Sequence, residues 1–320
     1  MDPRPTVLIT GAAGQDGTYL ARSLLADGRR VVGTISPHGQ GAARAALYAP
    51  GMETVVVDVR DAAALGRLVA DVAPAEIYNL AGVTSVARSW DDPATTFASN
   101  TAPVATLIDA CLALRSSGKA PRLFQASSAE AAAGESPYAR SKAEARSLVE
   151  VARREHGLFA VVATLFNHES PLRDRAFVTR KITAGAAAIA LGHAESLELG
   201  NLDVTRDWGF AGDFVEAMRL MLGGEEPLDL EIGTGVGHTL RDLVETAFAA
   251  AGVDDVWSRV TSSAGLMRPA DLAASVADPG PARERIGWKA SVGFEELVAR
   301  MVQVDLARLR TGVEDAVGYL

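Results

Sequence analysis

Cysteine is almost absent from the chain, which has Cys111 as its single thiol among 320 residues. One thiol excludes a disulfide within the chain and is typical of proteins in a reducing cytoplasm, where we expect this protein to reside. Cys111 lies in the apolar stretch 107–114, so we interpret it as a small core residue and not as a nucleophile.

Basic residues do not outnumber acidic ones: Lys and Arg total 31, Asp and Glu total 40, and the net charge is −9. No basic stripe is visible either, so we expect neither nucleic acid nor an anionic membrane as a partner. The five histidines show no ligand spacing, and no metal site is predicted.

Long hydrophobic runs are also missing. No apolar run approaches the roughly 20 residues of a membrane span. A signal peptide has a basic region followed by an apolar core, and the N-terminus does not show this pattern. Yet 48% of the residues are hydrophobic, enough for a large core. We therefore expect one large domain or two closely joined lobes, with no membrane partner.

Short β-rich runs alternate with helical stretches through the first half of the chain. Expected strands are residues 7–10, 30–35, 53–58, 76–80, 122–126 and 158–165, and expected helices are 17–27, 62–72, 102–114, 138–156 and, at the end, 294–309. The alternation predicts an α/β fold, a doubly wound parallel sheet of the Rossmann type. We expect this domain at 1–165 with return segments at about 203–233, and a smaller C-terminal substrate-binding lobe formed mainly by 166–320.

Three glycines, Gly11, Gly14 and Gly17, occupy the turn between the first expected strand and helix, with Gln15 and Asp16 among them. Glycine permits a tight turn, lets a pyrophosphate approach the backbone and leaves the helix N-terminus open to it. The G-x-x-G-x-x-G spacing is that of short-chain dehydrogenases. We therefore predict that these five residues bind a dinucleotide.

The residues after the second strand bear on which dinucleotide binds. An acidic residue about 20 positions after the glycines usually holds the free ribose of NAD. This chain has no acidic residue there until position 53, which favours NADP, with NAD still possible. Ser36 and Arg44 could meet the 2′-phosphate. Asp58, with Val59, could hold the adenine, or Asp58 could cap the following helix; both interpretations stay open.

Tyr138 and Lys142 are four positions apart, one turn apart on one face of a helix. A free tyrosine hydroxyl has a pKa of about 10, and a lysine ammonium one turn away favours the phenolate and lowers this value. The pair suits proton removal from a sugar or alcohol hydroxyl while hydride leaves the same carbon. Just upstream, Ser127 or Ser128 would face that hydroxyl, and Glu130 is placed to act as a carbon base.

These motifs resemble the GDP-mannose 4,6-dehydratases, a family of extended short-chain dehydrogenases/reductases. The matching stretches are residues 9–17, 78–81, 125–130, 136–138, 165–171, 177–182, 199–203, 206–209, 268–271 and 287–289. The stretches in the second half are specific to this branch, while those in the first half are shared by the superfamily. Together they extend over nearly the whole chain.

The resemblance implies dehydration of GDP-mannose to GDP-4-keto-6-deoxymannose with NADP as cofactor. Tyr138 would take the O4 proton as C4 gives up hydride, with Ser128 and Lys142 assisting. Glu130 would then remove the C5 proton, water would leave from C6, and hydride would return to C6.

The resemblance also implies the binding residues. Leu80 and Ala81 would contact the cofactor. Substrate contacts would come from Asn167, Val178 and Lys181 for the nucleotide sugar and from Arg206 and Arg268 for its diphosphate. Arginine suits phosphate because its fork binds two oxygens at once.

Three departures from the family pattern matter. Ser128 stands where the family has threonine, and Ala129 stands where it has serine, so one hydroxyl is lost. The loop 131–136 is much shorter than in the family, so we expect it to leave the pocket more open or to reshape the sugar subsite, with Glu130 moved as a further consequence. The stretch after the second strand lacks the paired arginines that the family uses around NADP and for tetramer contacts. We therefore expect a homodimer built from helices 102–114 and 139–156.

Two other interpretations remain. A related nucleotide-sugar 4-epimerase or 4-keto reductase would keep the first oxidation without the elimination, and net NADPH consumption would indicate the reductase. A non-catalytic NADP-binding protein would have a degenerate site, which Ala129 and the short loop allow. The presence of Ser128, Glu130, Tyr138 and Lys142 argues against it.

Overall fold

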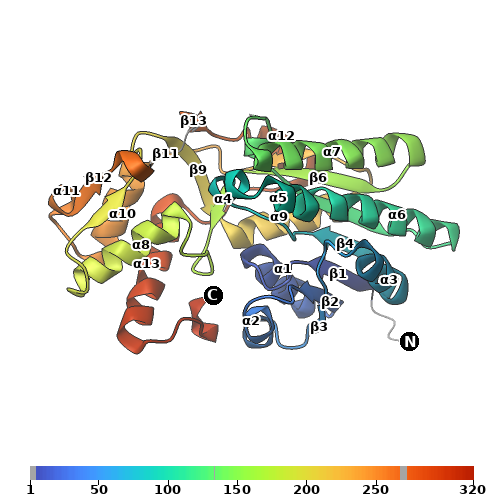
Figure 1. Cartoon of the computed structure of the whole chain (residues 1–320), viewed down its shortest axis with the longest axis horizontal. Helices are drawn as coiled ribbons and strands as arrows, with labels where there is room; N and C mark the ends of the chain where they lie inside the picture. Colours follow the sequence, from blue (N-terminus) through green and yellow to red (C-terminus); the bar gives the residue numbers. More distant parts are fainter. Residues whose placement is uncertain (1–4, 133, 267–271) are drawn as a thin grey trace. The chain divides into compact units, whose positions relative to one another are not determined.

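The computed structural model describes residues 5–132, 134–266 and 272–320, and the chain forms two units (Figure 1). The first comprises the described residues of Met1–Leu165, Val215–Ile232 and Pro281–Trp288, and the second those of Phe166–Phe214, Gly233–Gly280 and Lys289–Leu320. The sequence predicted return segments at about 203–233; in the structure the chain returns to the first unit twice, at 215–232 and at 281–288.

Seven parallel strands form the central sheet of the first unit, in the order β10-β6-β5-β4-β1-β2-β3. They are β1 (Thr6–Thr10), β2 (Arg30–Ile35), β3 (Glu53–Val56), β4 (Glu76–Asn79), β5 (Arg122–Ser128), β6 (Ala160–Leu165) and β10 (Leu230–Ile232). The strand order reverses between β1 and β4, the point at which such sheets bind ligands. The predicted doubly wound α/β fold is confirmed, with β10 as a short strand that the sequence analysis missed.

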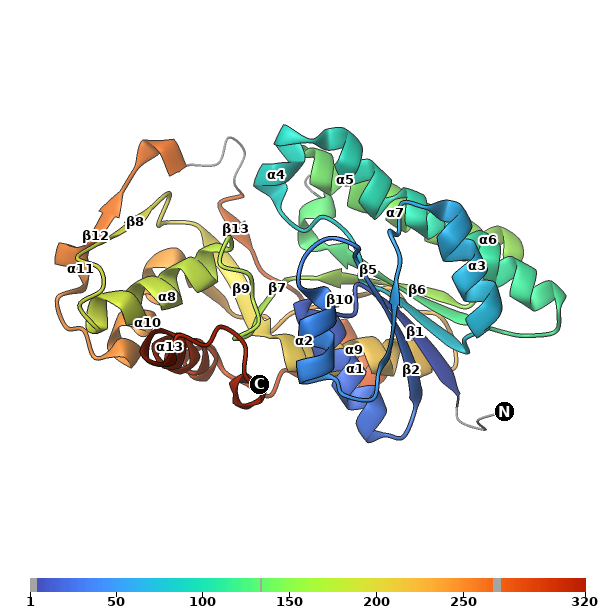
Figure 2. The same cartoon turned by 60° about the horizontal axis from the view of Figure 1, so that its bottom comes forward.

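Helices cover both faces of this sheet (Figure 2). One face carries α3 (Ala62–Val72), α6 (Ala102–Ser116) and α7 (Pro137–His156), and the other carries α1 (Gln15–Ala26) and α9 (Ala211–Gly223). On the first face, Leu65, Leu107 and Val149 belong to one buried apolar cluster with the strands. On the second, Arg219 of α9 forms an ion pair with Asp27 at the end of α1. Because both faces are buried, the strands read as apolar runs in the sequence.

Several short helices of the first unit were not predicted. They are α2 (Gly41–Tyr48), α4 (Val86–Asp91), α5 (Pro93–Asn100) and α12 (Gly280–Ile286). Because α5 leads directly into α6, the 24-residue stretch Pro93–Ser116 is long enough to cross a membrane, and an 18-residue window within it, with a mean hydropathy of 1.3, is apolar enough by composition alone. The sequence analysis did not identify this stretch, because polar residues such as Asn100 and Asp109 interrupt its apolar residues. The apolar composition has a structural cause, since Val104, Leu107 and Cys111 are fully buried in the core shared with α3 and α7.

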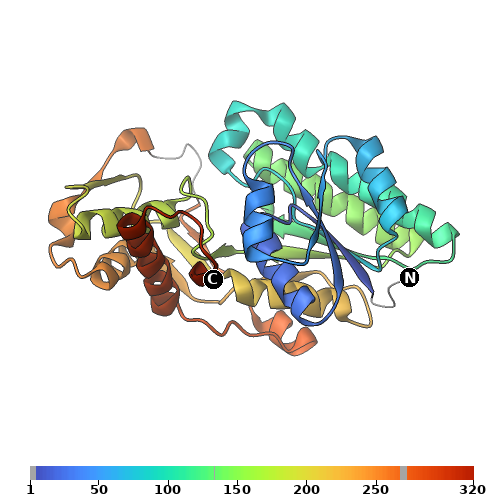
Figure 3. The same cartoon turned by 90° about the horizontal axis from the view of Figure 1, so that it is seen from below.

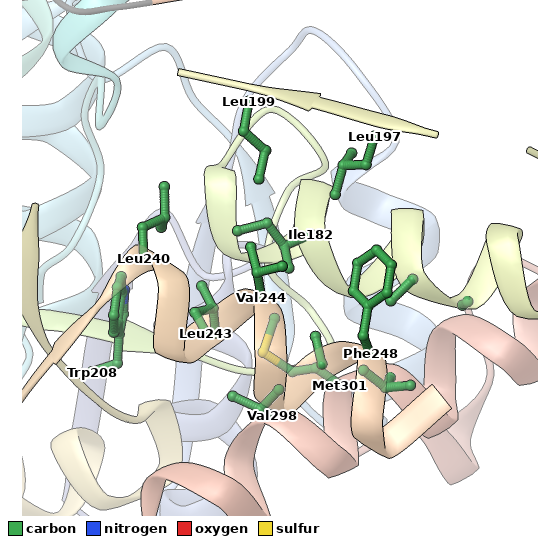
Figure 4. Packing of buried hydrophobic residues seen from close by; sticks show 14 of the residues in the cluster. Ile182, Leu197, Leu199, Trp208, Leu240, Leu243, Val244, Phe248, Val298 and Met301 are labelled. Carbon is green, nitrogen blue, oxygen red and sulfur yellow. The ribbon is translucent and has the colours of Figure 1, made fainter. Parts of the chain in front are cut away.

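The second unit combines small sheets with helices. Its elements are β7 (Asn167–Glu169), α8 (Val178–Ala190), β8 (Leu197–Leu199), β9 (Thr205–Phe210), β11 (Gly237–Thr239), α10 (Leu240–Ala251), α11 (Val256–Arg259), β12 (Val260–Ser262), β13 (Ala274–Ser275) and α13 (Phe294–Thr311). β9 pairs with β11, β13 and β7, while β8 pairs with β12. Ile182, Val244, Phe248, Val298 and Met301 pack together where α8, α10 and α13 meet (Figure 4). The second unit therefore has a hydrophobic core of its own.

Asp207 of β9 holds two loops of the second unit together. Its side chain is fully buried and accepts four hydrogen bonds: from Thr234 N (2.9 Å) and Oγ1 (2.6 Å), from Gly235 N (2.8 Å) and from Ala277 N (3.3 Å). A buried carboxylate is tolerated only when its oxygens are satisfied in this way.

We expect Asp207→Asn to destabilise the protein by about 2–4 kcal/mol, because an amide offers one acceptor oxygen and leaves backbone donors unpaired. Calorimetric thermal unfolding measures the loss. Asp203→Asn is the control, since Asp203 is exposed and its pair with Arg241 (2.8 Å) contributes little. Equal melting temperatures for Asp207→Asn and the wild type would contradict this account.

Candidate active site

Side chains at the carboxyl ends of β1, β4 and β5 are joined by hydrogen bonds. Thr10 Oγ1 donates to Asn79 Oδ1 (2.6 Å), and Asn79 Nδ2 donates to Gln125 Oε1 (2.7 Å). Thr10 Oγ1 also accepts from the amides of Leu80 and Ala81 (3.1 Å each). These bonds fix the predicted cofactor contacts Leu80 and Ala81 at the end of β4. The sequence analysis did not identify Thr10, Asn79 or Gln125 as site residues, although the stretches 78–81 and 125–130 contain two of them.

The glycine turn leaves no room for a Cβ atom at Gly11 or at Gly17. Gly11 has a φ of +71°, and a Cβ there would lie 2.9 Å from Ala81 Cα. A Cβ on Gly17 would lie 2.5 Å from Gly11 O. Both clashes are with backbone atoms, so no small shift of a neighbouring side chain would relieve them. This close packing of the turn, β4 and α1 is what a pyrophosphate-binding turn requires.

The first helix begins directly after this turn with an open N-terminus. Its N-cap residue, Gly14, makes no side-chain capping hydrogen bond, and within the first turn Gln15 Nε2 donates to Asp16 Oδ1 (3.1 Å). At the end of β5, the buried Ser127 Oγ has no hydrogen-bond partner in the part of the chain that the structure describes. A glycine-led helix N-terminus and an unpaired buried hydroxyl both fit a bound dinucleotide.

The two residues predicted to meet a 2′-phosphate follow β2. Ser36 is exposed, and its Oγ accepts from the His38 amide (3.2 Å). Arg44 lies on α2, which starts close to the glycine turn, because a Cβ on Gly41 would lie 3.3 Å from Ala13 Cβ. Both residues therefore belong to segments beside the turn, and their role stays a prediction.

Asp58 is held by its neighbour Arg60. The guanidinium donates to Asp58 Oδ1 (2.9 Å) through Nε and to Oδ2 (2.6 Å) through Nη2, and these hydrogen bonds lower the pKa of Asp58 to about 2. The N-cap residue of α3 is Asp61, so the interpretation that Asp58 caps this helix is wrong. A role for Asp58 and Val59 at the adenine stays a prediction.

The end of β5 carries the first two predicted catalytic residues. Ser128 is its last residue, and Glu130 lies in the following 3₁₀ turn, η1 (Ala129–Ala132), which packs against α7. Ser128 Oγ accepts from the Glu130 amide (3.3 Å). Tyr138 lies in the first turn of α7 and is buried. The structure therefore brings Ser128, Glu130 and Tyr138 to one end of β5, while their catalytic roles stay predictions.

Lys142 lies one turn after Tyr138 and is buried, with Nζ donating to Ala126 O (3.1 Å). Nζ is 5.9 Å from the centre of the Tyr138 ring. Burial lowers the pKa of Lys142 to about 8, and the negative charge of Asp16 counteracts this in part. An ammonium ion held here would favour the phenolate form of Tyr138.

Asn100, the last residue of α5, ties α7 to the loop after β4. Its Oδ1 accepts from the Val83 amide (2.8 Å), and its Nδ2 donates to Val83 O (3.1 Å) and to Ser141 Oγ (3.0 Å). Ser141 Oγ in turn donates to Tyr138 O (2.7 Å). The backbone of Tyr138 is thereby linked to that loop. The sequence analysis missed Asn100, because a lone asparagine in a helical stretch forms no pattern of its own.

Three of the predicted substrate residues lie in the second unit, on β7 and in the first turn of α8. Asn167 is exposed at the start of β7. Val178 is the first residue of α8 and Lys181 the fourth, and the N-cap residue of this helix makes no side-chain hydrogen bond. Their contacts with a nucleotide sugar stay predictions.

Of the two arginines predicted to bind the diphosphate, the structure describes Arg206 only. Arg206 of β9 is buried, and its Nη1 donates to Thr205 O (2.8 Å) and Leu272 O (2.7 Å). Arg268 lies outside the described residues. Since β7 pairs with β9, Asn167 and Arg206 lie on neighbouring strands.

The arrangement in the first unit suits coupled proton and hydride transfer. A phenol, an ammonium and a carboxyl group, from Tyr138, Lys142 and Glu130, lie where β5 ends and α7 begins, and the turn after β1 suits a dinucleotide. Within residues 5–132, 134–266 and 272–320, no group of three or more His, Cys, Asp or Glu side chains could hold a metal ion.

Comparison with known proteins extends over both units. The family model described as GDP-mannose 4,6 dehydratase matches residues 8–301. This chain belongs to that family. It is 37% identical to GDP-mannose 4,6 dehydratase 2 of Arabidopsis thaliana, covering 96% of this chain and 88% of that protein. The human GDP-mannose 4,6 dehydratase is 35% identical, with 97% and 93% covered. Among solved structures, the Thermus thermophilus UDP-glucose 4-epimerase complex with NAD has a TM-score of 0.80 at 28% identity, covering 96% of this chain and 100% of that one.

We expect Lys142→Met to raise the free energy of unfolding at neutral pH by about 1–3 kcal/mol. The pKa of Lys142 is about 8 in the folded chain against an ordinary 10.5, so burying its charge costs stability below pH 8. As the pH rises from 8 towards 10.5, the folded chain loses this proton before the unfolded chain does. The wild type then gains stability and the advantage of the variant shrinks.

Calorimetry at neutral pH and at about pH 9.5 measures both effects of Lys142→Met. Lys119→Met, at an exposed lysine, is the matched control and should show neither. A Lys142→Met variant less stable than the wild type at neutral pH, or an advantage independent of pH, would contradict the buried charge.

Proposed function

We propose that this protein is a nucleotide-sugar 4,6-dehydratase, a lyase that converts GDP-mannose to GDP-4-keto-6-deoxymannose with a bound nicotinamide cofactor, NADP. Membership of the GDP-mannose 4,6-dehydratase family supports the reaction. The observation that carries the proposal is the grouping of Ser128, Glu130, Tyr138 and Lys142 where β5 ends and α7 begins.

In this proposal, bound NADP+ supplies the redox chemistry by accepting hydride from C4 and returning it to C6. Tyr138, whose phenolate is favoured by Lys142, removes the proton from O4. Ser128 Oγ, which accepts from the Glu130 amide, keeps its own proton to donate to the same oxygen. The 4-ketone acidifies the C5 proton, and Glu130 removes it and passes it to the C6 hydroxyl, which leaves as water. When hydride returns to C6, C5 takes up the proton that Tyr138 removed from O4. The sugar loses one water, and the cofactor is unchanged at the end.

The choice of NADP over NAD rests on the segment after β2. An acidic side chain there would repel a 2′-phosphate, and this segment offers Ser36 instead, with Arg44 on α2 following it. Binding titrations with both coenzymes separate the two, and tighter binding of NAD would show that Ser36 and Arg44 do not recognise a phosphate.

Mass spectrometry of GDP-mannose after incubation with the protein and a trace of NADP+ tests the reaction. We expect the sugar to lose one water with no net NADPH formed. Tyr138→Phe and Glu130→Gln should each lower kcat by about a hundred- to ten-thousandfold, because each removes an acid–base group. Glu130→Gln should still oxidise C4. Glu135→Gln, at an exposed residue of the same loop, is the control and should retain activity.

Other products would point to the other interpretations. A nucleotide sugar of unchanged mass but altered configuration would indicate a 4-epimerase, and net NADPH consumption would indicate a 4-keto reductase. NADP binding without turnover of any nucleotide sugar would indicate a non-catalytic protein, for which Tyr138→Phe would be silent.

We also propose a homodimer through α6 and α7, which cover the same face of the sheet. Ala102 and Ala113 are exposed on α6, and Val151 of α7 is 38% exposed. Small and apolar side chains let helices of two copies approach closely. Light scattering should give twice the chain mass of 33.4 kDa, and Val151→Glu should shift the protein to a monomer. A mass of four chains would contradict the dimer.

A further inference from the structure

Asp305 of α13 is a buried carboxylate shared by two buried arginines of the second unit. Its side chain is 1% exposed, and those of Arg180 and Arg308 are 5% and 2% exposed. Asp305 Oδ1 accepts from Arg180 Nε (3.0 Å) and Arg308 Nη1 (2.9 Å), and Oδ2 accepts from Thr183 Oγ1 (2.8 Å). One buried negative charge thus faces two positive charges, and a second anion is needed for balance.

Glu314, in the segment after α13, supplies the second negative charge. Its Oε1 accepts from Arg180 Nη2 (2.7 Å), and its backbone O accepts from Arg308 Nε (2.7 Å). Burial acts to raise the pKa of Glu314, but the hydrogen bond and charge of Arg180 outweigh it, and the pKa lies below its ordinary value. The carboxylate is therefore ionised at neutral pH. Figure 3 shows the C-terminal segment, in dark red, turning back after α13.

The remaining donors of the two arginines hold the loop between β7 and α8. Arg180 Nη1 donates to Arg173 O (2.8 Å), and Arg308 Nη2 donates to Pro171 O (2.8 Å). Arg173 of this loop also pairs with the buried Glu169, the last residue of β7 (2.6 Å). Since the arginines bind backbone carbonyls, they fix the path of the chain from β7 to α8.

This loop connects Asn167 to Val178 and Lys181, which the proposed function assigns to the nucleotide sugar. We propose that Arg180 is a positioning residue for this substrate segment and that Glu314 latches it from the C-terminal segment. The inference rests on the proposed function, because it concerns residues that the proposed function assigns to the nucleotide sugar. Loosening the latch should weaken nucleotide-sugar binding, while the groups at the end of β5, in the other unit, keep their arrangement.

Glu314→Gln tests the latch, because it removes the charge and keeps the shape of the side chain. KM for GDP-mannose should rise about three- to tenfold, while kcat and the Kd for NADP+ stay within about twofold. Hydrogen exchange at the backbone amides of residues 172–177 should accelerate. Arg180→Lys should act in the same direction and more strongly. One ammonium group cannot replace a guanidinium that donates to Asp305, Glu314 and Arg173 O. Glu296→Gln, which breaks an exposed pair with Arg300 on α13, is the matched control.

Each outcome decides a separate point. Unchanged exchange at 172–177 in Glu314→Gln would overturn the latch, whatever the substrate is. Faster exchange with an unchanged KM, or a loss of kcat and NADP+ binding along with KM, would overturn the positioning role. A wild-type protein that neither binds nor converts GDP-mannose would refute the proposed function instead, and the exchange measurement would still decide the latch.

Discussion

The candidate active site depends on one buried positive charge, the ammonium of Lys142. Burying a charge costs free energy, so other contacts must hold it in place. The ammonium donates to Ala126 O, and Asp16 acts on it through its charge. Asn100 supports the same helix by donating to Ser141, whose hydroxyl donates to the backbone of Tyr138. If α7 rotated, the ammonium would lose its carbonyl partner and move away from the phenol. A residue of α5 therefore supports the position of the proposed base, which does not depend on the Tyr-x-x-x-Lys spacing alone.

The edge of the sheet adds a second constraint. Thr10, Asn79 and Gln125 join the ends of three adjacent strands through side-chain hydrogen bonds, and Thr10 also holds the amides of Leu80 and Ala81. Gly11 packs directly on Ala81, so the dinucleotide turn and the end of β4 are one packed block. In such a reaction, hydride and a proton leave neighbouring atoms of the substrate, so a small displacement of the cofactor or of the base lowers the rate strongly. Linking the cofactor turn to β5 through buried hydrogen bonds is a direct way to keep both elements in a fixed relation.

The sequence predicted features that depend on residues close together in the chain and missed those that depend on residues far apart. Apolar runs and glycine spacing are local, and they predicted six strands and the turn. Strand β10 has three residues, too few to show a pattern. The helix-capping alternative for Asp58 failed because Asp61, three positions on, takes that place. Asn100 meets Ser141 across 41 positions, and Arg180 meets Asp305 across 125, so no local pattern could reveal either. Family resemblance named Lys181 but not its neighbour Arg180, whose partners are supplied by the fold.

Glu130 shows how a chain can depart from the family pattern in one loop and still keep the groups to which the proposed function assigns the chemistry. This carboxyl group lies in η1, which follows β5 directly and packs against α7. Its amide donates to Ser128 Oγ, so the strand end itself orders the turn. A hydroxyl has one proton and two lone pairs, and Ser128 can accept from Glu130 while donating to a sugar oxygen. The hydroxyl lost at Ala129 is therefore not needed to order Glu130, and the loss of the longer loop need not abolish the elimination step.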